Sequence, residues 1–358
     1  MISRSIAEKL VGDIMSGRYT KTGKLPSEAE LSRAFGVSRM TLRAALEELR
    51  RQRLIEKRNG VGSFLTMRAM RKSGIIGLII PDYGEYAFFN VIEKEVRLHA
   101  SRLGYRVSLV STREHGRDAL ARDLRRKARK LAVSRAEGVI FRPLVDEKFA
   151  ESNHEVVNIL GNAKIPTVLI DSDITRPPQR SDYDLITVGN IGAGRKIAEH
   201  LHARGYKRIA FLMGENPLMA NSNWSDRLFG LAGELALLGQ REGVRQLGFP
   251  PEDESRLQKL LKSGRRPDAI VCGNDEQALK LLDSLKRLGV KVPDKVAVVG
   301  FDDISGAHAA CPPLTTVSQP VRLLAATAFK SLLARIRYPA SATREIRLDA
   351  PLVIRGTT

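Results

Sequence analysis

Hydrophobic positions follow two different patterns along the chain. Within residues 1–66 they recur at the spacing of amphipathic helices, which predicts a small helical domain there. From residue 74 onward, short apolar runs typical of buried strands alternate with helical segments. We therefore expect an N-terminal domain over 1–66, a basic linker over 67–73 and a larger α/β domain over 74–358.

Residues 25–65 begin with the local signals of two short helices joined by a tight turn. Ser27 caps the first helix, and Glu30 three residues later completes a capping box. Gly36 marks the turn, and Ser38 can cap the second helix. The inward-facing positions of that helix fall at i, i+3, i+4 and i+7, and they are Leu42, Ala45, Leu46 and Leu49.

A hairpin over residues 54–65, turning at Asn59-Gly60, follows these helices and predicts a wing. A helix-turn-helix inserts the N-terminal part of its second helix into the DNA major groove. Arg39 and Arg43 suit that task because guanidinium groups pair with guanine edges or phosphates, and Met40 can contact a thymine methyl. The candidate DNA-binding residues are Ser27, Ser38, Arg39, Met40, Thr41, Arg43, Asn59 and Gly60. The alternative is a small helical subdomain with charged outer faces.

The same stretch resembles the winged helix-turn-helix of the GntR family of bacterial transcription regulators. The matching residues are Leu25-Pro26-Ser27-Glu28, Val37-Ser38-Arg39, Thr41-Leu42-Arg43-x-Ala45-Leu46 and Gly60-x-Gly62-x-Phe64. The resemblance covers roughly residues 5–66. It departs at Ala29, where the family usually has an arginine that touches DNA, and at Arg53, where glycine is usual.

The second part of the chain contains two successive sets of strand–helix units. The expected strands are Ile75–Ile80, Arg106–Ser111, Gly138–Phe141 and Pro166–Ile170, then Arg208–Met213, Ala269–Cys272 and Val296–Gly300. Such alternation predicts mainly parallel sheets with right-handed crossovers, and two sets predict two lobes with a cleft. Because ligands bind beyond the carboxyl ends of such strands, we expect Asp171, Asn274, Asp275 and the loop over residues 81–89 near its opening.

Residues 74–358 resemble the effector-binding domain of the LacI/galactose-repressor family, which shares the periplasmic sugar-binding-protein fold. The strongest matches are Cys272-Gly273-Asn274-Asp275-x-x-Ala278-Leu279, Val292-Pro293-x-x-Val296-x-Val298-Val299-Gly300-Phe301-Asp302-Asp303 and Pro312-Pro313-Leu314-Thr315-Thr316-Val317-x-Gln319-Pro320. A weaker one is Arg227-x-x-Gly230. The combination is similar to arabinose-repressor-type regulators. It implies an α/β protein with an N-terminal winged helix-turn-helix and a two-lobed periplasmic-binding-protein-like domain with parallel sheets.

The second resemblance also implies which residues bind the effector. Leaving a polar group unpaired costs about 1–3 kcal/mol, so a polyhydroxylated ligand needs oriented acceptors and donors. Arg227 and Asp275 are the first candidates for this task. The next candidates are Asp171, Asn274 and Gln319. Arg142 stands where relatives present a polar contact, and its charge hints at an acidic or phosphorylated ligand.

Three aromatic residues follow the first strand of the body, where sugar-binding relatives place stacking rings; they are Tyr86, Phe88 and Phe89. The alternative for the two phenylalanines is packing between the loop and the next helix. Asp302 and Asp303 are expected to cap the connection to the hinge. Asn190 receives no role, because Gly189 replaces the aspartate that precedes it in relatives.

Charge supports the assignment of the first domain. The 358-residue chain has a net charge of +19, and residues 1–73 hold 16 Lys and Arg against 7 Asp and Glu. This excess favours a polyanion-binding domain there. A compositional bias of the whole proteome would produce the same sign, so charge alone is weak support.

No catalytic, metal or cofactor motif occurs in the sequence. Cys272 and Cys311 fit no metal spacing and suggest a reducing compartment, and the six histidines form no H-E-x-x-H motif. No P-loop, G-x-S-x-G or G-x-G-x-x-G is present. We expect no enzyme and no cofactor. No apolar run approaches a membrane span and the N-terminus begins no signal peptide, so we expect a cytoplasmic protein without a membrane partner.

The sequence thus predicts a transcription regulator that responds to a small molecule. We expect a homodimeric repressor of carbohydrate-metabolism genes, bound to a palindromic double-stranded operator and released by a sugar or related effector. Two alternatives use the same parts. One is a sugar-dependent activator, and the other is a small-molecule-binding protein whose N-terminal domain contacts another protein.

Overall fold

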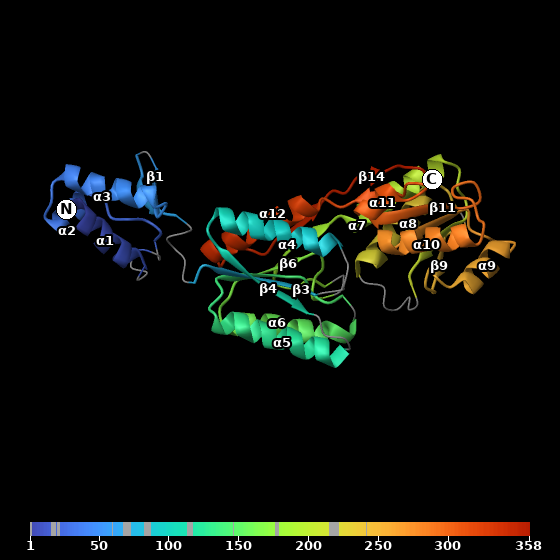
Figure 1. The fold of residues 1–358 in the computed structure, drawn as a ribbon, viewed down its shortest axis with the longest axis horizontal. Helices are drawn as coiled ribbons and strands as arrows, with labels where there is room; N and C mark the ends of the chain where they lie inside the picture. Colours follow the sequence, from blue (N-terminus) through green and yellow to red (C-terminus); the bar gives the residue numbers. More distant parts are fainter. Residues whose placement is uncertain are drawn as a thin grey trace.

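A computed structural model gives the fold (Figure 1). It describes residues 2–15, 19, 22–58, 60–66, 73–81, 87–112, 117–145, 147–175, 179–214, 222–240 and 242–358. Two predicted site residues, Asn59 and Tyr86, lie outside the described residues, as do linker residues 67–72.

The N-terminal part, called the head below, is a winged helix-turn-helix. Its helices are α1 (Ile2–Met15), α2 (Glu28–Phe35) and α3 (Arg39–Arg51), and its wing pairs β1 (Ile55–Arg58) with β2 (Gly62–Leu65) antiparallel. The capping box of Ser27 and Glu30 is present, Gly36 is left-handed with φ 64°, and Ser38 caps α3. The four predicted inward positions of α3 are buried, which confirms the helical pattern.

One lobe of the body, the N lobe, contains a six-stranded parallel sheet. Its order is β13 (Glu345–Leu348), β7 (Asp184–Val188), β6 (Thr167–Ile170), β5 (Gly138–Phe141), β3 (Ile75–Pro81) and β4 (Arg106–Thr112). Helices α4 (Ala87–Arg102) and α12 (Val321–Arg337) cover one face, and α5 (Arg117–Val133) and α6 (Ala150–Asn162) cover the other (Figure 1). A short 3-10 turn, Glu147–Phe149, precedes α6.

The other lobe, the C lobe, has a second six-stranded sheet. Its order is β14 (Leu352–Val353), β12 (Thr315–Ser318), β11 (Ala297–Asp302), β10 (Ala269–Cys272), β8 (Ile209–Leu212) and β9 (Val244–Leu247), with only β14 antiparallel. Helices α7 (Asn190–Ala203) and α8 (Ser222–Leu237) pack on one face. Helices α9 (Glu254–Lys262), α10 (Asp275–Arg287) and the short α11 (Ser305–Ala309) pack on the other.

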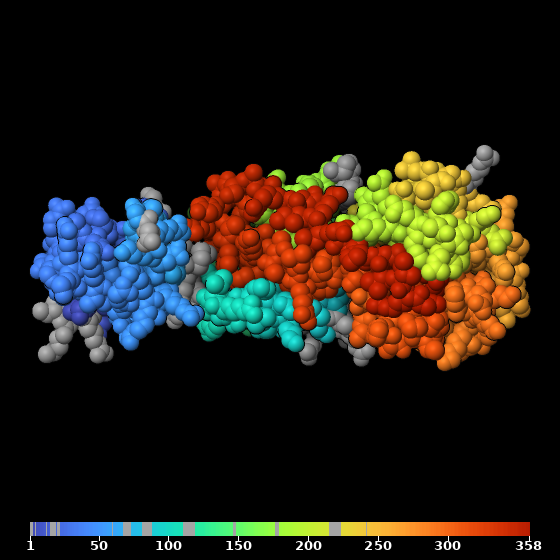
Figure 2. Space-filling view, turned by 90° about the horizontal axis from the view of Figure 1, so that it is seen from above, coloured from blue at the N-terminus to red at the C-terminus, as the bar shows by residue number. Residues whose placement is uncertain are grey.

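The two lobes are not two consecutive segments, which corrects the simple division expected from the strand pattern. The chain passes between the lobes after β7, again between β12 and α12, and a third time between β13 and β14. In Figure 2 the red C-terminal residues accordingly cover parts of both lobes. The alternation of strands and helices does not say which sheet each strand joins. The sequence therefore did not predict that β7, α12 and β13 belong to the N lobe.

Candidate functional site

The N-terminal turn of α3 presents most of the predicted DNA-binding residues to solvent. Arg39 and Met40 are exposed, and the Met40 side chain is 81% exposed. Arg43 is exposed too, and its Nε donates to Glu28 Oε2 at 2.9 Å, which lowers the pKa of that carboxyl group. Gly60, at the wing tip, is exposed with φ 73°.

The hydroxyl groups of this face serve as helix caps. Ser27 Oγ accepts from the backbone of Glu30 at 3.3 Å, and Ser38 Oγ lies 2.9 Å from Thr41 Oγ1 and accepts from Thr41 N at 3.2 Å. These hydroxyls therefore position the helices that carry the arginines. Two cations beside the wing were not predicted from the sequence. Lys24 Nζ and Arg58 Cζ lie 5.6 and 4.5 Å from the centre of the Phe64 ring.

Arg227 stands at the centre of a polar cluster between the lobes. It lies on α8 and is 5% exposed; its Nε donates to Asn190 Oδ1 at 2.9 Å and its Nη1 to the Gly273 carbonyl at 2.5 Å. The guanidinium stacks 3.4 Å from the centre of the Phe301 ring. Burial lowers its pKa, and the carboxylates of Asp302, Asp171 and Asp275 favour the charged form. A rigid cation of this kind can orient an acceptor oxygen of a ligand.

Asp302 faces this cluster and does not cap the hinge connection, contrary to our expectation. Its Oδ1 accepts from Gln319 Nε2 at 2.5 Å. Burial, opposed by Arg227, raises the pKa of Asp302 to about 7, and its φ of 124° is a strained backbone conformation of the kind found at functional sites. The buried Gln319 Oε1 has no partner within the described part of the chain. Asp303 instead accepts from Arg355 Nη2 at 2.6 Å, a structural ion pair.

The N-lobe side of the cluster is built around Asp171. Its Oδ2 accepts from Arg142 Nε at 3.1 Å, and its Oδ1 accepts from Asn223 Nδ2 of the C lobe at 3.0 Å. The Arg142 guanidinium lies 4.9 Å from the centre of the Phe89 ring. Asp171 balances the charge of Arg142.

The two described aromatic candidates lie in the first turn of α4 and not in a loop. Phe88 and Phe89 form an edge-to-face pair with ring centres 5.1 Å apart, partly buried against the core. The sequence analysis gave packing between the loop and the next helix as the alternative to a stacking role, and both rings do pack against the core. Phe89 is the ring that also reaches the polar cluster, through Arg142.

Asp275 and Asn274, both predicted to bind the effector, make hydrogen bonds within the C lobe. Asp275 is fully buried, and its carboxylate accepts from Ile304 N at 3.0 Å and Thr316 Oγ1 at 2.5 Å. Burial raises its pKa. Asn274 caps α10 by accepting from Gln277 N at 2.9 Å. Both follow the end of β10, but the first turn of α10 directs them back into the lobe.

Three polar residues of the cluster were missed or set aside by sequence reasoning, namely Asn190, Asn223 and Asp302. Asn190 is buried against Arg227, and Asn223 joins the two lobes through Asp171. The signal available for Asn190 was its place directly after β7, at the start of a helix. The sequence analysis set Asn190 aside because Gly189 replaces the preceding aspartate, and the strand β7 that positions it was not predicted.

The raised pKa of Asp302 predicts a pH dependence of stability. The folded chain binds this proton up to about pH 7, whereas an unfolded aspartate loses it near its ordinary pKa of 3.8. Stability therefore falls as pH rises through this window, because the folded state holds more protons there. In thermal unfolding between pH 4 and 8, Asp302→Asn should flatten this fall, leaving a smaller slope from Asp275 and Asp226, whose pKa values burial also raises. An unchanged slope would show that Asp302 titrates normally.

A winged DNA-binding head joined to a two-lobed body with a polar cluster between the lobes defines a ligand-responsive DNA-binding regulator. Comparison with known proteins agrees for both parts. Residues 2–65 match the gntR family of bacterial regulatory proteins, and residues 198–358 match the periplasmic binding protein-like domain. The chain thus carries a GntR-type helix-turn-helix domain and a periplasmic-binding-protein-like domain.

Similar proteins match this chain over most of their length. The arabinose metabolism transcriptional repressor of Halalkalibacterium halodurans is 26% identical, covering 99% of this chain and 95% of its own. A transcriptional regulator CelR–cellobiose complex, 22% identical with a TM-score of 0.66, covers 93% of this chain and 100% of its own. A lac repressor dimer bound to operator and the anti-inducer ONPF is 25% identical with a TM-score of 0.65, and the match covers 81% of this chain and 96% of the lac repressor chain.

Proposed function

We propose that this protein is a sequence-specific repressor of carbohydrate-metabolism genes that leaves its operator when a sugar binds between the lobes. The observation that carries the proposal is the union, in one chain, of an exposed α3 turn bearing Arg39, Met40 and Arg43 with the polar cluster around Arg227. The similar arabinose repressor and the cellobiose-bound regulator support this choice of ligand class. Such a protein works in the cytoplasm by binding and not by catalysis.

The head, taken as residues 1–66, would read one half-site of the operator. Arg39, Met40, Thr41 and Arg43 would enter the major groove, with Met40 against a thymine methyl. Ser27, Ser38, Asn59 and Gly60 would approach phosphates. A homodimer requires a palindromic site with half-sites about one helical turn apart, and the lac repressor comparison supports a dimer.

The body, taken as residues 74–358 behind a linker over 67–73, would hold a neutral sugar. Arg227 can donate to a hydroxyl oxygen, and Asp302 and the unpaired Gln319 Oε1 can accept hydroxyl protons. Phe89 offers an aromatic face for the C–H surface of a sugar ring, with Arg142 and Asp171 beside it. A ligand that contacts both lobes shifts the equilibrium between lobe arrangements through its different affinity for each.

Arg43→Ala tests the DNA-binding face. We expect a loss of about 1–3 kcal/mol of operator binding, because a base or phosphate contact disappears. Arg51→Ala is the matched control: Arg51 is also exposed and paired with a glutamate, but it lies at the other end of α3. We expect the control to stay within about 0.5 kcal/mol. The measurement is fluorescence anisotropy with labelled operator at several salt concentrations. Equal affinities of the two variants would remove Arg43 from the reading face.

A further inference from the structure

A cavity borders the polar cluster on its hinge side. Its volume is about 510 Å³, within the range of about 300–1,000 Å³ usual for small-molecule sites. Asp171, Asn190 and Asn223 of that cluster form one of its walls, whereas Arg227 and Asp302 do not line it. The N lobe contributes β7 and β13 to its walls, and the C lobe contributes the first turn of α7 and the start of α8.

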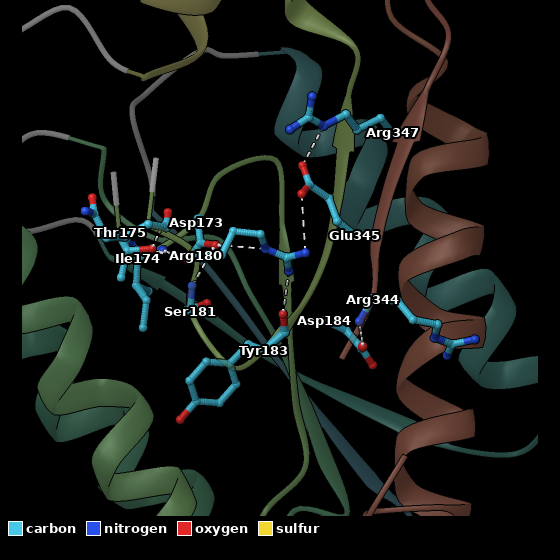
Figure 3. A network of polar contacts seen from close by, with 11 residues as sticks. Asp173, Ile174, Thr175, Arg180, Ser181, Tyr183, Asp184, Arg344, Glu345 and Arg347 are labelled. Carbon is cyan, nitrogen blue, oxygen red and sulfur yellow. Dashed lines mark hydrogen bonds and ion pairs between the residues drawn. The ribbon is translucent and has the colours of Figure 1, made fainter. Parts of the chain in front are cut away.

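Most of the charge around this cavity is already balanced within the N lobe. Glu345 binds Arg347 Nε at 2.6 Å through one oxygen and Arg180 Nη1 at 3.3 Å through the other. Arg180 also lies 3.8 Å from Asp173, so the four side chains form one network (Figure 3). Arg347 enters this network through its Nε, and its side chain is still 60% exposed. It can therefore bind an acceptor in the cavity with its remaining guanidinium nitrogens.

Asp226 is the unbalanced group on the opposite wall. It projects from α8 of the C lobe, and within the described residues it has no hydrogen-bond or ion-pair partner, not even Arg347. Burial raises the pKa of Asp226, while Arg347 and Arg227 oppose that shift. A cation bound in the cavity would supply the partner that this carboxylate lacks.

Between these two charges the cavity has an apolar part in a wall that is otherwise mostly polar. Val188 of β7 is buried beneath it, and Ile191 of α7 lines it with 42% of its surface exposed. The first residues of α7 also border it, and the cap residue Gly189 offers their backbone N–H groups no side-chain acceptor. The chemical complement of these walls has an ammonium, a carboxylate and an aliphatic group.

We propose that the hinge-side cavity binds a small zwitterion of the aliphatic α-amino acid type. Its ammonium pairs with Asp226, its carboxylate with Arg347 and the start of α7, and its side chain packs on Val188 and Ile191. Asp226 belongs to the C lobe and Arg347 to the N lobe, so the ligand links the lobes and biases the motion that the effector uses. A metal ion fits less well, since no group of three metal-binding side chains occurs within the described residues.

The test uses the full chain and L-leucine as the probe. Calorimetry and thermal unfolding should detect binding of L-leucine, and not of 3-methylbutylamine or 4-methylpentanoate, which each lack one of its two charges. Asp226→Asn and Arg347→Gln should each weaken binding about tenfold or more, as expected when a charged hydrogen bond is lost. Asp302→Asn should leave it unchanged, because Asp302 does not line this cavity.

Several results would overturn the proposal. One is the absence of L-leucine binding, and another is equal binding of the amine or the acid alone. A third is binding that persists in both Asp226→Asn and Arg347→Gln. Binding abolished by Asp302→Asn but not by Asp226→Asn would place the amino acid among the residues around Arg227. None of these results depends on whether a sugar also binds there, so a failure here is distinguishable from a failure of the sugar hypothesis.

Discussion

Gly230→Ala is expected to destabilise the body by about 1–3 kcal/mol or more, as overpacking does, and to abolish effector binding. A Cβ on Gly230 would lie 2.0 Å from the Ile191 backbone oxygen, and one on Gly194 would lie 2.2 Å from the Arg227 backbone oxygen. Helices α7 and α8 therefore cross with their backbones in direct contact. Because neither neighbour is a flexible side chain, an added methyl group must push the helices apart.

The effect on binding follows from the position of Arg227, one turn before Gly230. Its guanidinium spans the two helices through the 2.9 Å bond to Asn190 at the start of α7. Separation of the helices breaks this bond and displaces the cation that the proposed sugar site uses. The Arg227-x-x-Gly230 spacing seen in the sequence thus has a physical reason, since the glycine allows the approach that orients the arginine.

Gly233→Ala is the matched control on the same helix. Nothing lies within 4 Å of a Cβ at this position, so alanine should stabilise α8 by about 0.5–1 kcal/mol. Thermal unfolding and sugar calorimetry on the two variants measure the contrast. A Gly230→Ala protein as stable as Gly233→Ala would show that α7 and α8 can separate at no cost.

The head could be predicted closely because its determinants are local. The Ser27–Glu30 box, the left-handed Gly36 and the apolar spacing of α3 each act within a few residues of the sequence. Most strands of the body were also identified from short apolar runs. The membership of β7 and β13 in the N-lobe sheet was not, because their pairing joins residues about 160 positions apart, such as Leu185 and Glu345.

The site was predicted in part for the same reason. Arg227, Asp171, Gln319 and Arg142 do meet between the lobes, as the positions of their elements suggested. The sequence predicts Asp275 as the carboxylate for the sugar, whereas the surroundings of Arg227 favour Asp302, and both stand near a strand's carboxyl end. The choice between them depends on the positive φ of Asp302 and on a bond from Thr316 to Asp275. Neither the backbone angle nor the hydrogen bond can be predicted from the neighbouring residues in the sequence.

Asp302→Asn and Asp275→Asn should separate effector binding from stability. Asparagine at 302 can still accept from the Gln319 amide, and it removes a charge that burial disfavours, so the fold should persist. The lost charged hydrogen bond should weaken sugar binding by about 1.5–3 kcal/mol. Asparagine at 275 keeps only one acceptor oxygen, so its NH₂ group faces either the donor Ile304 N or Thr316 Oγ1, whose O–H then loses its acceptor in the fully buried site.

For Asp275→Asn we therefore expect a loss of about 1–3 kcal/mol of stability, the cost of an unsatisfied buried group. The remaining folded protein should bind sugar nearly as well as the unsubstituted chain. Calorimetry against a panel of pentoses, hexoses and their phosphates, alongside thermal unfolding, measures both quantities. We expect the unphosphorylated sugars to bind better, because Asp171 already balances Arg142. Loss of sugar binding in Asp275→Asn at full stability, with Asp302→Asn unaffected, would return the ligand-binding role to Asp275.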